Sequence, residues 1–528
     1  MSKPLGRLKR DYRILWNEDG GTLGFYNPPM TADEVARAHF GMLEGTQVDA
    51  YLAALGNAAG YTTVYPTKVR GMEFAVDRLA GGAKVGGVHL WRYAENVRSL
   101  WERGLDPVVI QLKEARRLGM DFWFQLRMND WHHADAEGKV ANLLGSPFFG
   151  DHPEWLIGKD GIAGWPESMK PAATFQDYAH SEVRRVRLET MAEACERYDI
   201  DGFQYDFLRC PCYFKRTETE KNIPVMTDFI RETRTILDRI GRQKGRILGL
   251  SVRVPNTIAG ARGLGLDVPA WVAEGLVDMV VPSTFFNADL EENITEWSAL
   301  VTGTPVRICP AIEEAYNAGH TGGWTRCFYR PPVMLPLSPE MISAIAARHW
   351  RNGADGLYVF NWFGTPATYD VDISPALKWI GDPGQLTFRT KRYVVMRWDG
   401  SFINCLPGRR QIPVRLDTEP VTVTIDVVDD PAAAGPRMAR VFLRVNIVNL
   451  TSADRVEVSM NGCPLNCADP LLPGRYGPES MFWQTYEIDR TVLRCGTNTI
   501  AFQARRNPRT AGEISLELAD VELGVEYD

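Results

Sequence analysis

The chain has 528 residues, of which 45% are hydrophobic and 24% are charged, and its formal net charge is −7. This is the composition of a globular protein long enough for a large domain and a smaller one, which excludes a disordered chain. The negative charge argues against a nucleic-acid partner, because such proteins concentrate positive charge on one face. An anionic ligand would need a few individually placed arginines.

The sequence carries no sign of a leader or a membrane segment. The N-terminus has basic residues without an apolar run behind them, and no later stretch approaches about 18 uninterrupted apolar residues. We therefore expect a soluble protein with no membrane partner; its location stays open, with the cytoplasm as default. The nine cysteines are odd in number and scattered, which favours reduced thiols. Cys210-Pro-Cys212 and Cys463-x-x-x-Cys467 lack the second pair that zinc requires, so we expect no metal and no cofactor.

Eight short runs rich in β-branched and aromatic residues alternate with helical stretches between residues 11 and 380. The runs are Tyr12–Asn17, Thr62–Tyr65, Asp121–Arg127, Gly202–Phe207, Ile247–Val254, Met279–Thr284, Val306–Pro310 and Gly356–Trp362. Eight repeated β-α units are the pattern of a closed (β/α)8 barrel. Three helix starts lie between the runs: Thr31-Ala-Asp-Glu34 fits a capping box, and Ser338-Pro339 and Ser374-Pro375 place a cap before a proline.

After residue 383 the apolar pattern changes to a period of two. Val421–Val427, Val441–Val448 and Val521–Tyr527 alternate apolar and polar residues, which is typical of strands with one face in a core. The sequence therefore predicts an α/β protein with two domains. A (β/α)8 TIM-type barrel would be the catalytic domain over 1–383, and a C-terminal antiparallel β-sandwich (jelly-roll-like) domain would cover 384–528.

Polar side chains gather at the carboxyl ends of the predicted strands, where barrel enzymes carry their reactive groups. Because side chains alternate along a strand, three pairs of residues are expected to face the barrel interior: Gln125 and Arg127, Gln204 and Asp206, and Ser251 and Arg253. A buried, charge-balanced network accounts for Asp206 and Arg253. It accounts less well for Arg127 and Arg209, which are candidates for binding an anion, since a guanidinium can hold a carboxylate with two hydrogen bonds.

Two further residues are candidates for proton transfer. His132 follows the strand-end arginine by five residues, and the adjacent His133 points to a different side. Asp19 lies between Glu18 and a glycine pair that lets the backbone turn tightly, which can present its carboxylate at the barrel rim. From position alone, a structural histidine and an ordinary turn aspartate explain these residues as well as catalysis does.

These segments resemble the active-site pattern of glycoside hydrolase family 156, the inverting exo-sialidases, which have a (β/α)8 barrel followed by a β-sandwich domain. The resemblance covers both domains in outline and is specific at Asn17-Glu-Asp19-Gly-Gly, Arg127-Met-Asn-Asp-Trp-His132, Asp206-Phe-Leu-Arg209 and Asn361. It implies a homodimer that releases terminal sialic acid from sialylated glycans, with Asp19 as general base and His132 as general acid. It also implies that Arg127 and Arg209 hold the sialic acid carboxylate and that Asn361 contacts the sugar.

An inverting mechanism suits this substrate. The anomeric carbon of sialic acid carries a carboxylate, which would repel a carboxylate nucleophile but not a water molecule. Asp19 would deprotonate that water on the face opposite to the acid. Trp16, Trp131 and Trp362 offer apolar faces for the acetamido methyl or the glycerol chain.

Two other functions stay open. A neutral-sugar glycosidase would use a carboxylate pair, Asp206 with Glu313 or Glu314, but would leave both arginines and His132 without a role. An inactive glycan-binding barrel would bind its ligand without turnover. A metal-dependent hydrolase is less favoured, because barrel enzymes of that kind usually need histidines on strand one, which has none.

Overall fold

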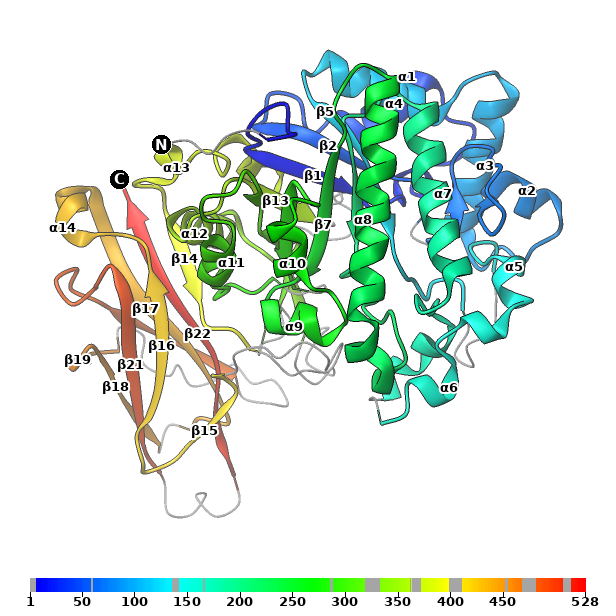
Figure 1. Ribbon diagram of the computed structural model, residues 1–528. Coiled ribbons are helices and arrows are strands. Elements are labelled where there is room, and N and C mark those ends of the chain that lie inside the picture. The colour runs from blue at the N-terminus through cyan, green and yellow to red at the C-terminus, as the bar shows by residue number, and fades with distance from the viewer. Residues whose placement is uncertain are drawn as a thin grey trace.

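The computed structural model describes residues 6–57, 60–134, 142–164, 167–284, 288–318, 333–360, 362, 372–397, 411–451, 454–467, 481–506 and 514–528. Nine parallel strands form one sheet in the order β10-β13-β1-β2-β5-β6-β7-β8-β9 (Figure 1). They are β1 (Ile14–Glu18), β2 (Val48–Ala54), β5 (Asp121–Arg127), β6 (Gly202–Asp206), β7 (Gly249–Pro255), β8 (Met279–Ser283), β9 (Arg307–Ile308), β10 (Ala311–Glu313) and β13 (Leu357–Phe360).

The two ends of this sheet are pieces of one barrel strand, interrupted at Cys309 and Pro310. β9 pairs with β8, and β10 pairs with β13. At the interruption, the Cys309 N–H donates to the Val280 carbonyl at 3.0 Å and the Tyr358 N–H donates to the Pro310 carbonyl at 2.9 Å. The sheet therefore closes around eight strand positions, which confirms the predicted barrel.

The second barrel strand is not where the sequence predicts it. The predicted run Thr62–Tyr65 contributes only Thr62–Thr63 (β3), which pairs with Glu73–Phe74 (β4) in a separate small sheet, whereas the barrel uses Val48–Ala54. Three of the seven residues of Val48–Ala54 are alanines and one is leucine, which favour helices in isolation. Its residues are nevertheless buried on both faces, as in other parallel sheets, so packing overrides the local preference.

Helices cover the outside of the barrel (Figure 1). The capping box is confirmed at α1 (Ala32–Phe40), where the Glu34 N–H donates to the Thr31 hydroxyl at 3.2 Å and the Thr31 N–H donates to the Glu34 carboxylate at 2.7 Å. Ser338 caps α12 (Pro339–Arg351) as predicted. Ser374, in contrast, begins a 3-10 helix, η6 (Ser374–Lys378), and donates to Asp372 instead of capping.

No helix in the described ranges is long and apolar enough to cross a membrane. The remaining barrel helices vary in length. They are α2 (Ala75–Ala80), α3 (Val88–Glu102), α4 (Pro107–Arg117), α5 (Pro147–Gly150), α6 (Gly158–Gly161), α7 (Ser181–Arg197), α8 (Thr219–Gln243), α9 (Ile258–Gly263), α10 (Val268–Ala273), α11 (Thr295–Leu300) and α13 (Pro383–Leu386), with 3-10 turns η1 (Thr22–Gly24), η2 (Pro153–Trp155), η3 (Glu167–Thr174) and η4 (Arg216–Glu218). A hairpin of β11 (Ala315–Ala318) and β12 (Val333–Pro336) follows β10.

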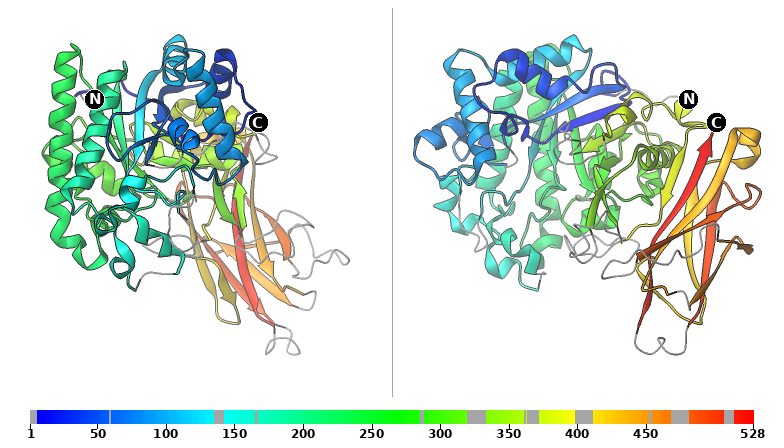
Figure 2. Two further views of the ribbon diagram at one scale, coloured as in Figure 1. Left: turned by 90° about the vertical axis from the view of Figure 1, so that its right-hand side faces the viewer. Right: turned by 180° about the vertical axis from the view of Figure 1, so that it is seen from behind.

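The C-terminal region is built from two antiparallel sheets (Figure 2). One contains β14 (Lys391–Val394), β15 (Val414–Leu416), β17 (Met438–Val448), β20 (Met481–Glu487) and β22 (Leu516–Tyr527). The other contains β16 (Val421–Val427), β18 (Arg455–Met460), β19 (Cys463–Leu465) and β21 (Gly496–Arg505), and α14 (Pro431–Ala434) and η7 (Gly435–Arg437) lie between strands. Leu443 and Leu523 of the first sheet and Ile425 and Phe502 of the second share a core of their own. The predicted β-sandwich is confirmed, and its boundary at residue 383 stays a prediction.

Candidate active site

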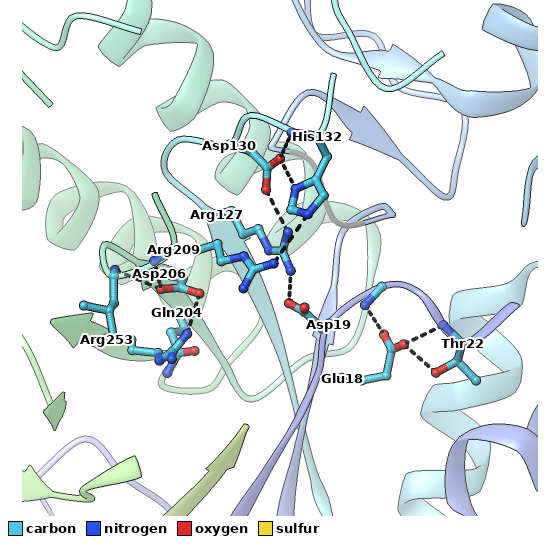
Figure 3. Close-up of polar contacts among 12 residues, drawn as sticks. Glu18, Asp19, Thr22, Arg127, Asp130, His132, Gln204, Asp206, Arg209 and Arg253 are labelled. Atoms are coloured by element: carbon cyan, nitrogen blue, oxygen red, sulfur yellow. Dashed lines mark hydrogen bonds and ion pairs between the residues drawn. The ribbon is translucent and has the colours of Figure 1, made fainter. Parts of the chain in front are cut away.

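Asp19 follows β1 in a loop shaped by glycine. Gly20 has a φ of +85°, and a Cβ there would lie 2.0 Å from the Gly56 carbonyl oxygen, so only glycine fits. The Glu18 carboxylate accepts from the Gly20 N–H at 2.9 Å and from the Thr22 hydroxyl at 2.7 Å, and burial raises its pKa. Figure 3 shows Glu18 directed toward Thr22 and Asp19 directed the other way. Glu18 therefore supports the loop, and Asp19 is the carboxylate presented to the site.

Five ionisable side chains form a continuous network at the carboxyl ends of β1, β5 and β6 (Figure 3). One terminal nitrogen of Arg127 pairs with Asp19, and the other lies 2.7 Å from Asp130. Asp130 lies 2.5 Å from Nδ1 of His132 and accepts from the His132 backbone N–H at 2.7 Å. Nη2 of Arg209 lies 3.5 Å from Nε2 of His132. The network thus brings two cations, two carboxylates and one imidazole together.

Burial and charge set the electrostatics of this network. The side chains of Asp19, Arg127 and Asp130 are buried, whereas that of His132 is 34% exposed. Burial alone would raise the pKa of Asp130, but the charges of His132 and Arg127 hold it below its usual value. Burial and the positive charge of Arg127 together lower the pKa of Arg209. Two buried guanidinium groups that repel each other favour an anion beside them.

A second ion-pair cluster joins the other side of the barrel. Arg253 lies 3.1 Å from Asp206 and 2.6 Å from Glu313, and its guanidinium carbon lies 3.6 Å from the centre of the Phe360 ring. Asp206 also accepts from the Arg209 N–H at 3.0 Å. This is the buried network that the sequence predicts for Asp206 and Arg253, with Glu313 as a third member. Its carboxylates are held by several donors each.

Glu313 of this cluster and the adjacent Glu314 have raised pKa values. Burial raises the pKa of Glu313 to about 7, although Arg253 opposes the shift. Burial, with the negative charges of Glu313 and Asp19, raises the pKa of Glu314 to about 8. Glu314 is only partly buried, so it is the carboxyl group on this side that a ligand can reach.

The structure brings four of the five predicted site residues together, namely Asp19, Arg127, His132 and Arg209. The fifth, Asn361, lies outside the described residues. Sequence reasoning missed Asp130, which touches both Arg127 and His132. The signal was present, because an aspartate two residues before a histidine can accept that residue's backbone N–H within a single turn.

Two of the three tryptophans predicted to contact the sugar line one pocket. Trp16 and Trp362 line a pocket of about 90 Å³ together with Phe25 and Tyr26. Trp131 instead packs beside Phe175, with 6.2 Å between the ring centres. Within the described part of the chain, no group of three or more His, Cys, Asp or Glu side chains is arranged to hold a metal ion.

No protein-family model and no curated protein matches the sequence. Solved structures that resemble it include a glucanotransferase for cycloisomaltooligosaccharides from Paenibacillus sp. (10% identity, 98% of this chain and 57% of that chain, TM-score 0.34). They also include α-L-fucosidase isoenzyme 2 from Paenibacillus thiaminolyticus (13%, 70% and 48%, 0.41) and the PgaB (BpsB) glycoside hydrolase domain from Bordetella bronchiseptica (12%, 70% and 99%, 0.42). The chain thus spans about half the length of the first two. Glycoside hydrolases are among these neighbours, but at such scores the likeness carries no inference about activity.

Proposed function

We propose that the protein is an inverting exo-sialidase, a glycoside hydrolase that releases terminal sialic acid from glycans. The observation that carries this proposal is the pair of buried guanidinium groups of Arg127 and Arg209 in the network that contains His132. A sugar with a carboxylate on its anomeric carbon matches such a pair through charge-assisted hydrogen bonds. The bound carboxylate would also offset the burial and the repulsion that together lower the pKa of Arg209.

In this proposal, His132 is the general acid and Asp19 is the general base. Asp19 takes a proton from water, the water oxygen bonds to the anomeric carbon as the bond to the leaving oxygen breaks, and His132 gives that oxygen its proton. A single displacement of this kind inverts the anomeric centre. Because Nδ1 of His132 faces Asp130, Nε2 is the nitrogen that transfers the proton.

Arg209 lies beside the nitrogen that transfers the proton. Its Nη2 lies 3.5 Å from Nε2 of His132, and a guanidinium has hydrogen-bond donors only. A substrate carboxylate bound by Arg209 would therefore lie close to this nitrogen.

The neutral-sugar alternative fits the geometry less well. Asp206 and Glu313 share Arg253 and are almost fully buried, so they form a scaffold more readily than an acid and base pair. Glu314, with its pKa of about 8, is the member of that alternative able to donate a proton. An inactive glycan-binding barrel differs from both enzymes in showing no turnover. The sugar contact of Asn361 and the homodimer stay predictions of the family resemblance.

Anomer-resolved proton NMR of sialyllactose hydrolysis tests the proposal, with His132→Ala and Asp19→Asn measured alongside. We expect β-sialic acid to appear first and both variants to lose turnover. His152→Ala is the matched control, since His152 is exposed to a similar extent and also lies 2.8 Å from a carboxylate, that of Glu154. Release of a neutral sugar from an aryl glycoside, without release of sialic acid, would favour Asp206 with Glu313 or Glu314 instead.

A further inference from the structure

We propose that the side-chain amides of Gln125 and Asn17 hold the water molecule that Asp19 activates. The inference rests on the proposed function, because an inverting hydrolase has to bind its nucleophilic water at a fixed place opposite the leaving group. Asp19 deprotonates this water, and a further group has to hold its oxygen in line with the anomeric carbon.

Gln125 and Asp19 reach the barrel interior at the same height. The register places Glu18 beside Ala53 and Ala54 beside Gln125, so Asp19, the residue after Glu18, falls level with Ala54. Neighbouring strands are about 4.8 Å apart, which separates the Cα atoms of Asp19 and Gln125 by roughly 10 Å. Ala54, the residue between them, is too short to fill that gap. In this proposal, the water occupies the room between these two polar side chains, beneath the guanidinium of Arg127.

Asn17 lies below Asp19 on the same face of the chain. Leu15, two residues earlier, packs in the barrel interior, and alternation along the strand gives Asn17 and Asp19 the same direction. Asn17 therefore lies below Asp19 and beside Leu52, which lies below Ala54, and these two residues form the floor of the space whose sides are Asp19 and Gln125.

Both amides are buried without hydrogen-bond partners among the described residues. Gln125 is 1% exposed and Asn17 is 3% exposed, yet neither the oxygen nor the nitrogen of either amide has a partner there. Gln204, the next amide at this height, donates to Ser251 at 2.9 Å and accepts from Tyr358 at 2.8 Å. Buried polar groups that the protein leaves unsatisfied are normally satisfied by internal water, which needs two to four polar partners.

The geometry also favours a water on the face of the sugar opposite to the leaving group. His132 lies at the rim with its side chain 34% exposed, so the leaving group departs toward solvent. Asp19 and Gln125 are buried below, so the water approaches from the interior. There it accepts a hydrogen bond from an amide N–H, donates one hydrogen to an amide oxygen and the other to Asp19, and keeps a lone pair for the anomeric carbon. Asp19 receives the proton as the new bond forms, and the departing oxygen takes the proton of His132.

A crystal structure of the ligand-free protein that shows ordered water is the first test. We expect one water within hydrogen-bonding distance, about 2.7–3.2 Å, of Asp19, Gln125 and Asn17. Amides of Gln125 and Asn17 that bind only protein groups, or a dry space between them, would overturn the proposal. Because no turnover is needed, this test can fail while the sialidase assignment stands.

The second test is kinetic and uses Gln125→Ala with 4-methylumbelliferyl α-sialoside. We expect kcat to fall about 100-fold while KM changes less than about threefold, because the arginines and not Gln125 bind the substrate. Sodium azide should restore release of methylumbelliferone. Azide fits the vacated volume and attacks the anomeric carbon as the aryl oxygen leaves, so β-sialosyl azide forms without a base.

Gln111→Ala is the matched control for this experiment. Gln111 lies on α4 outside the barrel interior, is 5% exposed, and has an amide oxygen without a partner in the described ranges. We expect this control to keep its kcat and to gain nothing from azide. A Gln125→Ala variant with unchanged kcat, or with a raised KM alone, would overturn the proposal. If the unmodified protein releases no sialic acid, the sialidase assignment fails and the crystal structure decides the water site.

Discussion

The substitution Asp130→Asn removes one charge from the buried centre of the site without changing its shape. Asp130 is fully buried, and its two oxygens lie 2.7 Å from Arg127 and 2.5 Å from Nδ1 of His132. An asparagine offers an acceptor to only one of these donors, so the other meets an NH₂ group. The variant therefore breaks the connection between the residue that binds the carboxylate and the residue that protonates the leaving group.

The expected loss follows from the two contacts. A hydrogen bond to a charged group contributes about 1.5–3 kcal/mol, which corresponds to roughly 10- to 150-fold in a rate. We expect kcat on sialyllactose to fall by this factor, because a sugar leaving group needs the proton of His132. The methylumbelliferyl group leaves with little assistance, so its kcat should fall much less.

Steady-state kinetics on both substrates measure this difference. Asp201→Asn is the control, since Asp201 is equally buried, lies 2.5 Å from Arg116 and accepts from the Phe122 N–H at 2.8 Å at the opposite end of the barrel. The control should lower stability and leave the ratio of the two rates unchanged. Equal losses on both substrates for Asp130→Asn would refute the reasoning, because they would indicate general damage to the fold.

Three further predictions concern the scaffold. Asp206→Ala leaves Arg253 half unpaired in the interior, and we expect urea denaturation to show a loss of about 3–5 kcal/mol; a loss near zero would contradict a buried ion pair. Burial lowers the pKa of His133 from 6.5 to about 4, so between these values the unfolded chain binds a proton that the folded chain does not, and stability falls as the pH drops. His133→Phe should remove about 3 kcal/mol of the loss of stability at acid pH. The plot of denaturation midpoint against pH should therefore be flatter for this variant. Gly20→Ala puts a Cβ 2.0 Å from the Gly56 carbonyl, and we expect a lower Tm and lost turnover; wild-type kinetics would show that the loop tolerates the contact.

The barrel was predictable from the sequence because most of its strands consist of residues that favour the strand conformation in any context. The run Asp121–Arg127 contains three aromatic residues and becomes β5 with the predicted bounds. Val48–Ala54 is different, since its alanines acquire a strand conformation only from the neighbours that bury them. Local sequence cannot report such a strand, because the interactions that stabilise it come from residues distant in the chain.

The positions of the candidate site residues were predictable to the same extent as the barrel strands. Arg127 is the last residue of β5 and Asp19, His132 and Arg209 follow strand ends, and a closed parallel barrel collects those ends on one rim. Asp130 was missed because its contacts depend on how the turn after β5 folds back. Gln125 was predicted to face inward. Its position relative to Asp19 was not predictable, because Ala54 lies between the two residues and belongs to β2, the strand that was predicted at the wrong place in the sequence.

The seventh barrel strand is interrupted, and the break between β9 and β10 leaves a seam in one wall of the barrel. β9 and β10 are two and three residues long, and the chain continues from them directly into the hairpin of β11 and β12. Arg253 crosses this seam, because it joins Asp206 on β6 to Glu313 on β10. Its two ion pairs join the barrel strands at the place where those strands are shortest. A variant of Arg253 would weaken this wall, and because Asp206 also accepts from the Arg209 N–H, it would disturb the arginine proposed to bind the substrate as well.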